Sequence, residues 1–332
     1  MDRALVSLGH TQPHPLDLQQ LRADLSTLWR EEGKGVSRAC HATLVVIVTP
    51  GEDPEALIED LVLTHPSRVL CVERDPKLPP NDVVAWASGS CMKRSSGMLV
   101  CSETLHFLTG EAAEDRLPSI VRSLAVGGLP LAILSRETSP LRLLWINELG
   151  DDVDMIVGRS SALELRDAVA LWRESVECIE RPRVDDLTWD ELWPWRMAME
   201  NRFDQVRDVT RLSALSNVKV EMGGRPEPSP AAWLLAGWLG SRLGWRRPQP
   251  LDSNRVQVER SGGHTMIECH PARVTDTVTL GFEDGSDPIT WTLKELRAES
   301  PSAPISRALH RHEFQAVAVA ARRLALELTQ GT

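Results

Sequence analysis

The chain has 332 residues, of which 42% are hydrophobic and 25% are charged, so it can fold around sizeable cores and is not a disordered or fibrous protein. Its formal net charge of -10 argues against a protein that binds nucleic acid or an anionic membrane, because such proteins usually present a basic surface. Residues 1–180 carry 17 basic and 27 acidic side chains, whereas residues 181–332 carry 20 of each. The acidity of the first part fits a solvated face as well as a surface for a charged partner.

The start of the chain contains no apolar segment typical of a signal peptide. No run approaches the roughly 18 apolar residues that a membrane helix needs. The sequence therefore favours a cytoplasmic protein with reduced thiols. None of the six cysteines forms a C-x-x-C pair, so we predict neither a structural zinc ion nor a stable disulfide.

The first half of the chain alternates between two kinds of pattern. Apolar residues at helical spacing predict helices over 16–30, 53–63, 115–124, 143–149 and 161–177. Apolar or alternating runs predict strands over 42–50, 67–73, 98–109, 129–134 and 155–157, while 83–92 is ambiguous. Strands that alternate with helices indicate βαβ units. We therefore predict that residues 1–180 form a Rossmann-like α/β domain with three layers and a mostly parallel sheet.

The second half has a different order of elements. Proline and charge predict a linker over 179–186. One long helix or two follow over 188–215, with further helices over 231–245 and 314–328. Strands are predicted over 217–222, 255–260, 264–270, 275–283 and 288–293. This order predicts a smaller α+β domain over residues 187–332, with an antiparallel meander.

Motifs of known chemistry are absent from the sequence. It contains no G-x-G-x-x-G fingerprint, no P-loop, no H-E-x-x-H helix and no G-x-S-x-G elbow. Two Cys-His dipeptides occur, at Cys40 and Cys269, but adjacent side chains on a strand point to opposite faces. We therefore predict no catalytic residue, no cofactor site and no metal site.

The segment HPSR precedes a predicted strand. His65 and Arg68 are suited to holding an anion at a sheet edge, although a simple turn explains the same residues. Glu103 lies within a predicted central strand and needs a cationic partner there, for which Arg68 and Arg122 are the candidates. We expect a buried ion pair rather than a catalytic carboxylate.

The segment DDLTWDELWPWR is the most unusual part of the chain. It combines Trp189, Trp193, Trp195 and Arg196, and tryptophan with arginine is the composition of interface hot spots. On one helix, Trp189 and Trp193 would share a face and Trp195 would point elsewhere. We predict that these rings pack the joint between the two domains or meet a partner. The predicted interface residues are Trp189, Trp193, Trp195, Arg196, His65 and Arg68.

These landmarks occur in the order found in a known family. The matching pieces are LWREEG, HPSRVLCVERDP, VCSE, LPSIV, DDLTWDELWPWR and AAWLLAGWLGSRLGW. With them the chain resembles the glucose-6-phosphate dehydrogenase assembly protein family, also called the OpcA family. The part beyond Trp245 matches least clearly.

The resemblance implies a protein that is not an enzyme and binds no cofactor. It implies an assembly factor or allosteric activator that binds glucose-6-phosphate dehydrogenase, promotes its active oligomer and serves the oxidative pentose phosphate pathway. Two alternatives remain open on the residues alone. One is a sugar-phosphate-binding enzyme that uses His65, Arg68 and Glu103, and the other is a small-molecule sensor that binds in the crevice of the first sheet.

Overall fold

In the computed structural model, the chain forms two compact units. The described residues are 5–31, 36–38, 40–49, 54–55, 57–58, 61, 65–93, 99–136, 139–177, 182–204, 210–296, 300, 302–310 and 315–330. The first unit comprises Met1–Gly158, Glu180–Asp185 and Ser300–His310, and the second comprises Arg159–Ile179, Asp186–Glu299 and Arg311–Thr332. The division into domains at 1–180 and 187–332 stays a prediction, and compactness groups Arg159–Ile179 with the second unit.

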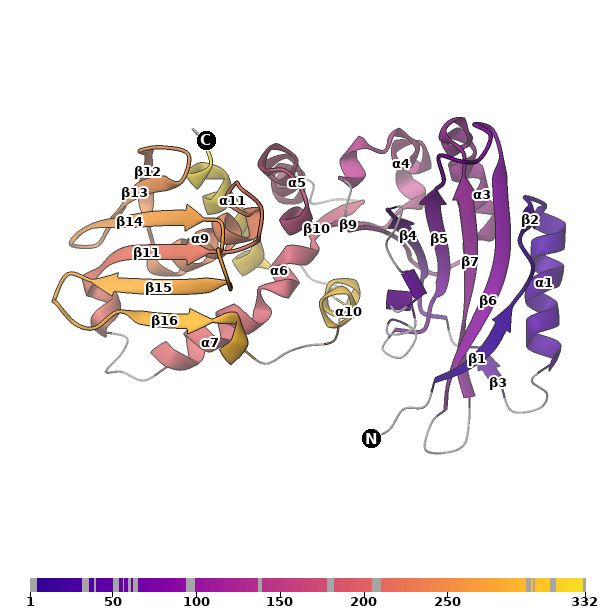
Figure 1. The fold of residues 1–332 in the computed structure, drawn as a ribbon, viewed down its shortest axis with the longest axis horizontal. Coiled ribbons are helices and arrows are strands. Elements are labelled where there is room, and N and C mark those ends of the chain that lie inside the picture. The colour runs from indigo at the N-terminus through magenta and orange to yellow at the C-terminus, as the bar shows by residue number, and fades with distance from the viewer. Residues whose placement is uncertain are drawn as a thin grey trace. The chain divides into compact units, whose positions relative to one another are not determined.

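A ten-stranded sheet forms the first unit (Figure 1). Its path is β1-β6-β7-β5-β4-β8-β9-β10, with β2 beside β6 and β3 beside β7. The strands are β1 (Leu5–His10), β2 (His14–Pro15), β3 (Val36–Arg38), β4 (Thr43–Val48), β5 (Arg68–Arg74), β6 (Val83–Lys93), β7 (Leu99–Thr109), β8 (Leu131–Ser135), β9 (Met155–Gly158) and β10 (Arg183–Asp186).

The centre of this sheet is parallel and doubly wound. The pairs β7–β5, β5–β4, β4–β8 and β8–β9 are all parallel. Across the sheet the parallel strands follow the order β7-β5-β4-β8-β9. Numbered by their position along the chain, this is the order 3-2-1-4-5, which is that of a Rossmann fold. β4 and β8 are buried on both faces, as their continuous apolar sequences predict. The predicted Rossmann-like domain is confirmed.

The ambiguous segment 83–92 is β6, which runs antiparallel to β7 and to β1. Its residues alternate between buried and half-buried positions, as expected for a strand covered on one face. The sequence was ambiguous because small and polar residues fill the alternate positions of this strand.

Helices lie on both faces of the first sheet. The helices of this unit are α1 (Leu18–Glu31), α3 (Leu117–Leu124), α4 (Leu144–Leu149) and α10 (Ala303–His310). α1 and α3 cover the face that carries Arg68 and Glu103, since Trp29 of α1 and the carbonyl of Leu124 in α3 bond to these side chains. Pro54 and Glu55 lie over the opposite face, beside His106. The rest of the helix predicted over 53–63 lies partly outside the described residues.

Cys91 and Cys101 form a disulfide, so the prediction of no disulfide is wrong. The two residues stand directly opposite each other in the antiparallel register of β6 and β7. Only this register brings them together, and it is a tertiary property that cysteine spacing does not reveal.

The second unit packs a six-stranded sheet against helices (Figure 1). The strand order is β12-β13-β14-β11-β15-β16. The strands are β11 (Leu215–Glu221), β12 (Arg246–Pro250), β13 (Arg255–Arg260), β14 (Gly263–His270), β15 (Thr277–Phe282) and β16 (Ile289–Thr292). The helices are α5 (Leu165–Glu177), α6 (Leu187–Glu191), α7 (Trp193–Phe203), α9 (Pro230–Leu243) and α11 (Ala316–Leu328). The predicted α+β fold is confirmed. The sheet is antiparallel except that β14 runs parallel to β11, which interrupts the expected meander.

Helices α9 and α11 form the core beneath this sheet. α9 is buried almost all round, which explains the apolar sequence of its whole length. Gly237 allows the two helices to approach closely, because a Cβ atom there would collide with the carbonyl oxygen of Ala321.

The predicted linker is wrong in part, because Arg183–Asp186 is β10 and its last three residues are buried. Of the one or two helices predicted over 188–215 the structure has two, because α6 ends before Leu192 and α7 begins at Trp193. The predicted end is wrong, since Leu215 already begins β11. Pro194 fits at the start of α7, where no helical partner is needed for its missing N–H.

Among the described residues, none of the helices combines the length and the apolar composition that a bilayer crossing requires.

Candidate functional site

Arg68 and Glu103 form the predicted ion pair. They are register partners on β5 and β7, and the Arg68 guanidinium donates to the Glu103 carboxylate. Trp29 donates its indole N–H to the same carboxylate at 3.2 Å. Arg122 pairs with Asp152 instead, at 2.6 Å. The expectation that Glu103 has a cationic partner is confirmed, and the partner is Arg68.

Arg68 of this ion pair also caps the C-terminal end of α3. Arg68 Nη1 donates to the carbonyl of Leu124 at 2.7 Å, at the last residue of α3, where a cation is favourable. A cavity of about 270 Å³ opens beside the pair. β5 begins at Arg68, so the cavity lies at the amino end of this strand. Ligands of doubly wound folds bind at the opposite, carboxyl ends of the strands.

His65 lies just before β5 and is buried. Its backbone N–H donates to the carbonyl of Leu61 at 2.6 Å, and its ring lies 5.7 Å from the ring of His41. These contacts fix the turn into β5, in line with the simpler of the two interpretations of HPSR.

Most of the tryptophan segment, which belongs to the second unit, is buried. Trp189, Trp195 and Arg196 are each at most 5% exposed, whereas Trp193 is 42% exposed. The Arg196 guanidinium lies 3.4 Å from the centroid of the Trp189 ring and 5.7 Å from that of Trp193. Trp189 also donates its indole N–H to Gln315 at 3.2 Å. The segment therefore places the Trp193 ring at the surface, over the buried guanidinium of Arg196.

Asp186 is the centre of a buried hydrogen-bond network in the same segment. Its carboxylate accepts bonds from the backbone N–H and hydroxyl of Ser160, at 3.0 and 2.6 Å, and from the indole of Trp172 at 2.8 Å. It also caps α6 by accepting from the N–H of Thr188 at 3.0 Å. Four donors hold a carboxylate with no exposed surface, so its role is to join α5, α6 and the turn before α5.

Glu191 adds an ion pair beside this network. It accepts from Arg159 Nε at 2.8 Å and from the Ser161 hydroxyl at 3.1 Å. Burial raises the pKa of Glu191, and the nearby Arg159 opposes this shift. The composition of the segment pointed to its aromatic rings, whereas nothing in the sequence singled out its carboxylates.

His106 is a further polar residue that no sequence motif singled out. It lies on β7 in the first unit, stacks on Trp86 with 4.8 Å between centroids, and bonds to the Ser88 hydroxyl at 2.9 Å. Burial, with a smaller contribution from the nearby His10, lowers its pKa to about 4. A cavity of about 230 Å³ adjoins the ring. A neutral, poorly basic imidazole of this kind serves as a hydrogen-bonding and stacking group.

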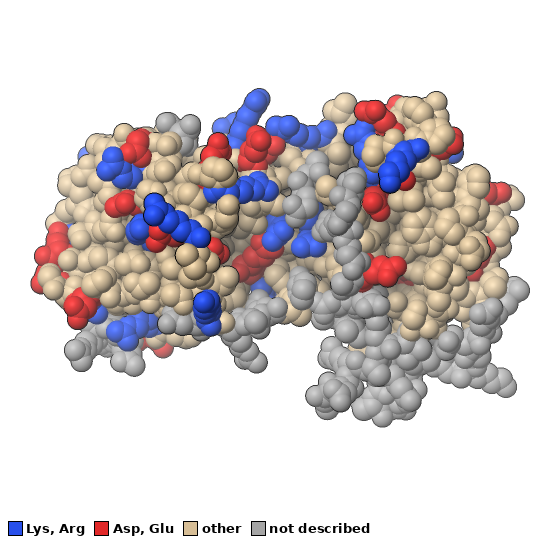
Figure 2. Space-filling view, in the orientation of Figure 1, with Lys and Arg blue, Asp and Glu red and all other residues tan. Residues whose placement is uncertain are grey.

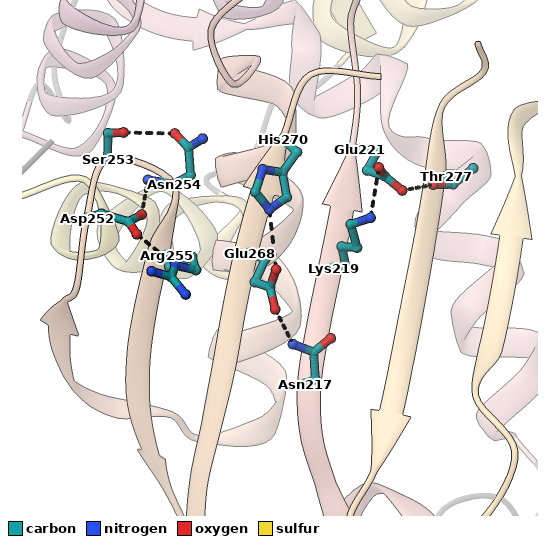
Figure 3. Close-up of polar contacts among 10 residues, drawn as sticks. All are labelled: Asn217, Lys219, Glu221, Asp252, Ser253, Asn254, Arg255, Glu268, His270 and Thr277. Atoms are coloured by element: carbon teal, nitrogen blue, oxygen red, sulfur yellow. Dashed lines mark hydrogen bonds and ion pairs between the residues drawn. The ribbon is translucent and has the colours of Figure 1, made fainter. Parts of the chain in front are cut away.

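The outer face of the second sheet is polar, with its charges paired (Figure 3). Glu268 accepts from Asn217 at 2.8 Å and lies 3.3 Å from His270 Nε2. Lys219 and Glu221 form an ion pair at 2.9 Å. Basic and acidic side chains also lie intermixed over the face that Figure 2 presents. Within the part of the chain that the structure describes, no group of three or more His, Cys, Asp or Glu side chains is arranged to hold a metal ion.

Fold and site together define a class of protein in which a Rossmann-like α/β unit is combined with an α+β unit that contains the tryptophan segment. Residues 182–330 match a family model that describes the C-terminal domain of a glucose-6-phosphate dehydrogenase subunit. This match and two curated relatives that carry the name OpcA confirm the resemblance to the OpcA family seen in the sequence.

Two curated relatives are named as putative OxPP cycle protein OpcA. The protein of Nostoc punctiforme is 26% identical over 219 residues, which cover 64% of this chain and 44% of that protein. The protein of Synechococcus elongatus is 23% identical over 197 residues, which cover 58% of this chain and 43% of that protein. The matched region therefore spans less than half the length of these relatives.

Two oxidoreductases are among the solved structures to which the chain is similar. The WlbA (WbpB) dehydrogenase of Thermus thermophilus is 14% identical with a TM-score of 0.47, covering 87% of this chain and 95% of that chain. Biliverdin reductase of Synechocystis sp. PCC 6803 is 7% identical with a TM-score of 0.47, covering 87% and 98%. At these identities the likeness concerns the fold alone.

Proposed function

We propose that this protein is a non-enzymatic assembly factor or activator that binds glucose-6-phosphate dehydrogenase and promotes its active oligomer. Two findings support the proposal. The matched family model describes part of a subunit of that enzyme, and the curated relatives are named as proteins of the OxPP cycle. The buried polar groups described above also have structural partners, which fits a protein that acts through its surface.

The exposure of the Trp193 ring is the observation that carries the proposal. It is a large apolar side chain left 42% exposed in a segment whose other rings are buried. The buried guanidinium of Arg196 lies beneath it and beside the fixed ring of Trp189. An aromatic anchor that is already ordered loses little freedom on binding, which is the property of interface hot spots. We propose Trp193 as the contact with the dehydrogenase.

An activator must bind the active state of its enzyme more tightly than the inactive state. A coupling of about fivefold to 150-fold corresponds to roughly 1–3 kcal/mol of differential contact. Truncating one hot-spot tryptophan to alanine typically costs roughly 2 kcal/mol or more of binding free energy. One side chain of this kind can therefore supply a large part of the difference in binding free energy between the two states.

We predict that Trp193→Ala weakens binding to the dehydrogenase about 30-fold, the equivalent of roughly 2 kcal/mol, and leaves the stability of the chain nearly unchanged. The exposed ring contributes little to the core, so its loss removes a contact without creating a cavity. The measurement is a titration of dehydrogenase activity with the variant, together with its thermal unfolding.

Leu144→Ala is the matched control, because Leu144 is 77% exposed and belongs to the first unit. It should activate like the wild type. If Trp193→Ala and Leu144→Ala both activate with wild-type affinity, Trp193 is not the contact. Loss of activation together with loss of folding in Trp193→Ala would also count against an exposed anchor.

A further inference from the structure

A groove lined by arginine side chains lies in the second unit, apart from the tryptophan segment. It has a volume of about 480 Å³ and runs between the end of α9, the start of β12 and α11. Arg246 and Arg247 line it from β12, and Arg323 lines it from α11. Val319 and Leu324 of α11 contribute apolar surface. The groove thus combines three cations with an apolar wall.

Two of these cations lack acidic partners. Arg246 and Arg323 are exposed, and neither forms an ion pair or a side-chain hydrogen bond with another described residue. Arg247 lies 3.4 Å from Glu259, but its side chain is 77% exposed, so this pair is weak. Residues 181–332 carry equal numbers of basic and acidic side chains, so two arginines without acidic partners leave a local excess of positive charge. The groove is consequently a positive site.

The backbone beneath the arginines is fixed. Arg247 has a φ of 49°, and it is the one non-glycine residue in the described part of the chain with a positive φ. A non-glycine residue in this region is strained, and such strain persists only where the surroundings impose it. Gly240 lies against Trp245 and Leu324, and a Cβ atom there would collide with both side chains. The groove is therefore formed before any ligand arrives.

We propose that this groove binds the phosphate group of a small phosphorylated molecule. Guanidinium groups present paired N–H donors that match phosphate oxygens, and three arginines line this groove. The volume lies within the range of small-molecule sites, and the apolar wall suits the uncharged part of such a ligand. Glu327 also lines the groove and can accept hydrogen bonds from hydroxyl groups. This site is independent of the proposed contact with the dehydrogenase.

The test uses pyrophosphate as the probe and calorimetry as the readout. Wild-type chain should bind it saturably with one site. The variant Arg246→Gln/Arg323→Gln should bind at least about tenfold more weakly, because each lost charge-assisted bond contributes to affinity. The matched control is Arg166→Gln/Arg273→Gln. Both of these arginines are exposed in the same unit without a side-chain partner among the described residues, and they lie outside the groove.

The control should bind pyrophosphate like the wild type, and all variants should keep the wild-type melting temperature because the changed residues are exposed. Three results would overturn the proposal. The first is no saturable binding by the wild type at low ionic strength. The second is equal weakening in the groove variant and the control. The third is binding of a hexaglutamate peptide but not of pyrophosphate, which would make the groove a docking site for an acidic protein segment.

Discussion

Replacing Asp186 with alanine should destabilise the chain by about 3–5 kcal/mol, the cost typical of disrupting a buried charged network. The carboxylate is completely buried and accepts four hydrogen bonds. Its removal leaves the indole N–H of Trp172 and the hydroxyl of Ser160 unsatisfied in the core, and each unsatisfied group carries its own desolvation cost. Denaturant unfolding with fluorescence detection measures the loss.

Glu200→Ala is the control for this experiment, because Glu200 is an exposed acid on α7. It should change the stability by less than about 0.5 kcal/mol. Asp186→Asn should fall between the two variants, since the amide keeps one acceptor oxygen but presents an N–H₂ group to other donors. Equal stabilities for Asp186→Ala and Glu200→Ala would show that the network does not hold the second unit together.

The stability of the first unit should fall as the pH is lowered from 6.5 to 4, and His106 should account for about 3 kcal/mol of this fall. The folded state holds the pKa of His106 at about 4, whereas an unfolded chain has the ordinary value of 6.5. Between these two values the unfolded state binds a proton that the folded state does not. The contribution of His106 is therefore fully present above pH 6.5 and is lost progressively below it.

His106→Gln tests this account, since glutamine can bond to Ser88 but does not titrate. Unfolding free energies at about pH 7 and about pH 5 should differ less in this variant than in the wild type. His264→Gln is the matched control because His264 is exposed, and it should keep the wild-type pH dependence. If His106→Gln keeps the wild-type slope, protonation of His106 is not linked to unfolding.

The fold was predictable wherever local patterns and tertiary structure agree. β4 and β8 are continuous apolar runs, and such runs are stable only as central strands of a covered sheet. That Glu103 has a cationic partner was predictable, because a carboxylate in a central strand requires one. The choice of Arg68 over Arg122 depends on the register of β5 and β7.

The features that the sequence did not reveal depend on contacts between residues that are far apart in the chain. β10 and β12 are short polar strands at sheet edges, and Pro250 ends the second of them, so neither carries a strand pattern of its own. The disulfide depends on the register of β6 and β7. The exposure of Trp193 depends on the break between α6 and α7, which separates it from the helix of Trp189. Composition identified the tryptophan segment, and only the structure distinguishes its one exposed ring.

The activity of glucose-6-phosphate dehydrogenase, measured with and without this protein, tests the central claim most directly. The enzyme from the same source should gain activity saturably as the chain is added, at a fixed stoichiometry and with a shift toward its larger oligomer. The chain alone should show no dehydrogenase activity. An unchanged rate and oligomeric state at saturating concentrations, or substrate turnover by the chain itself, would contradict the account.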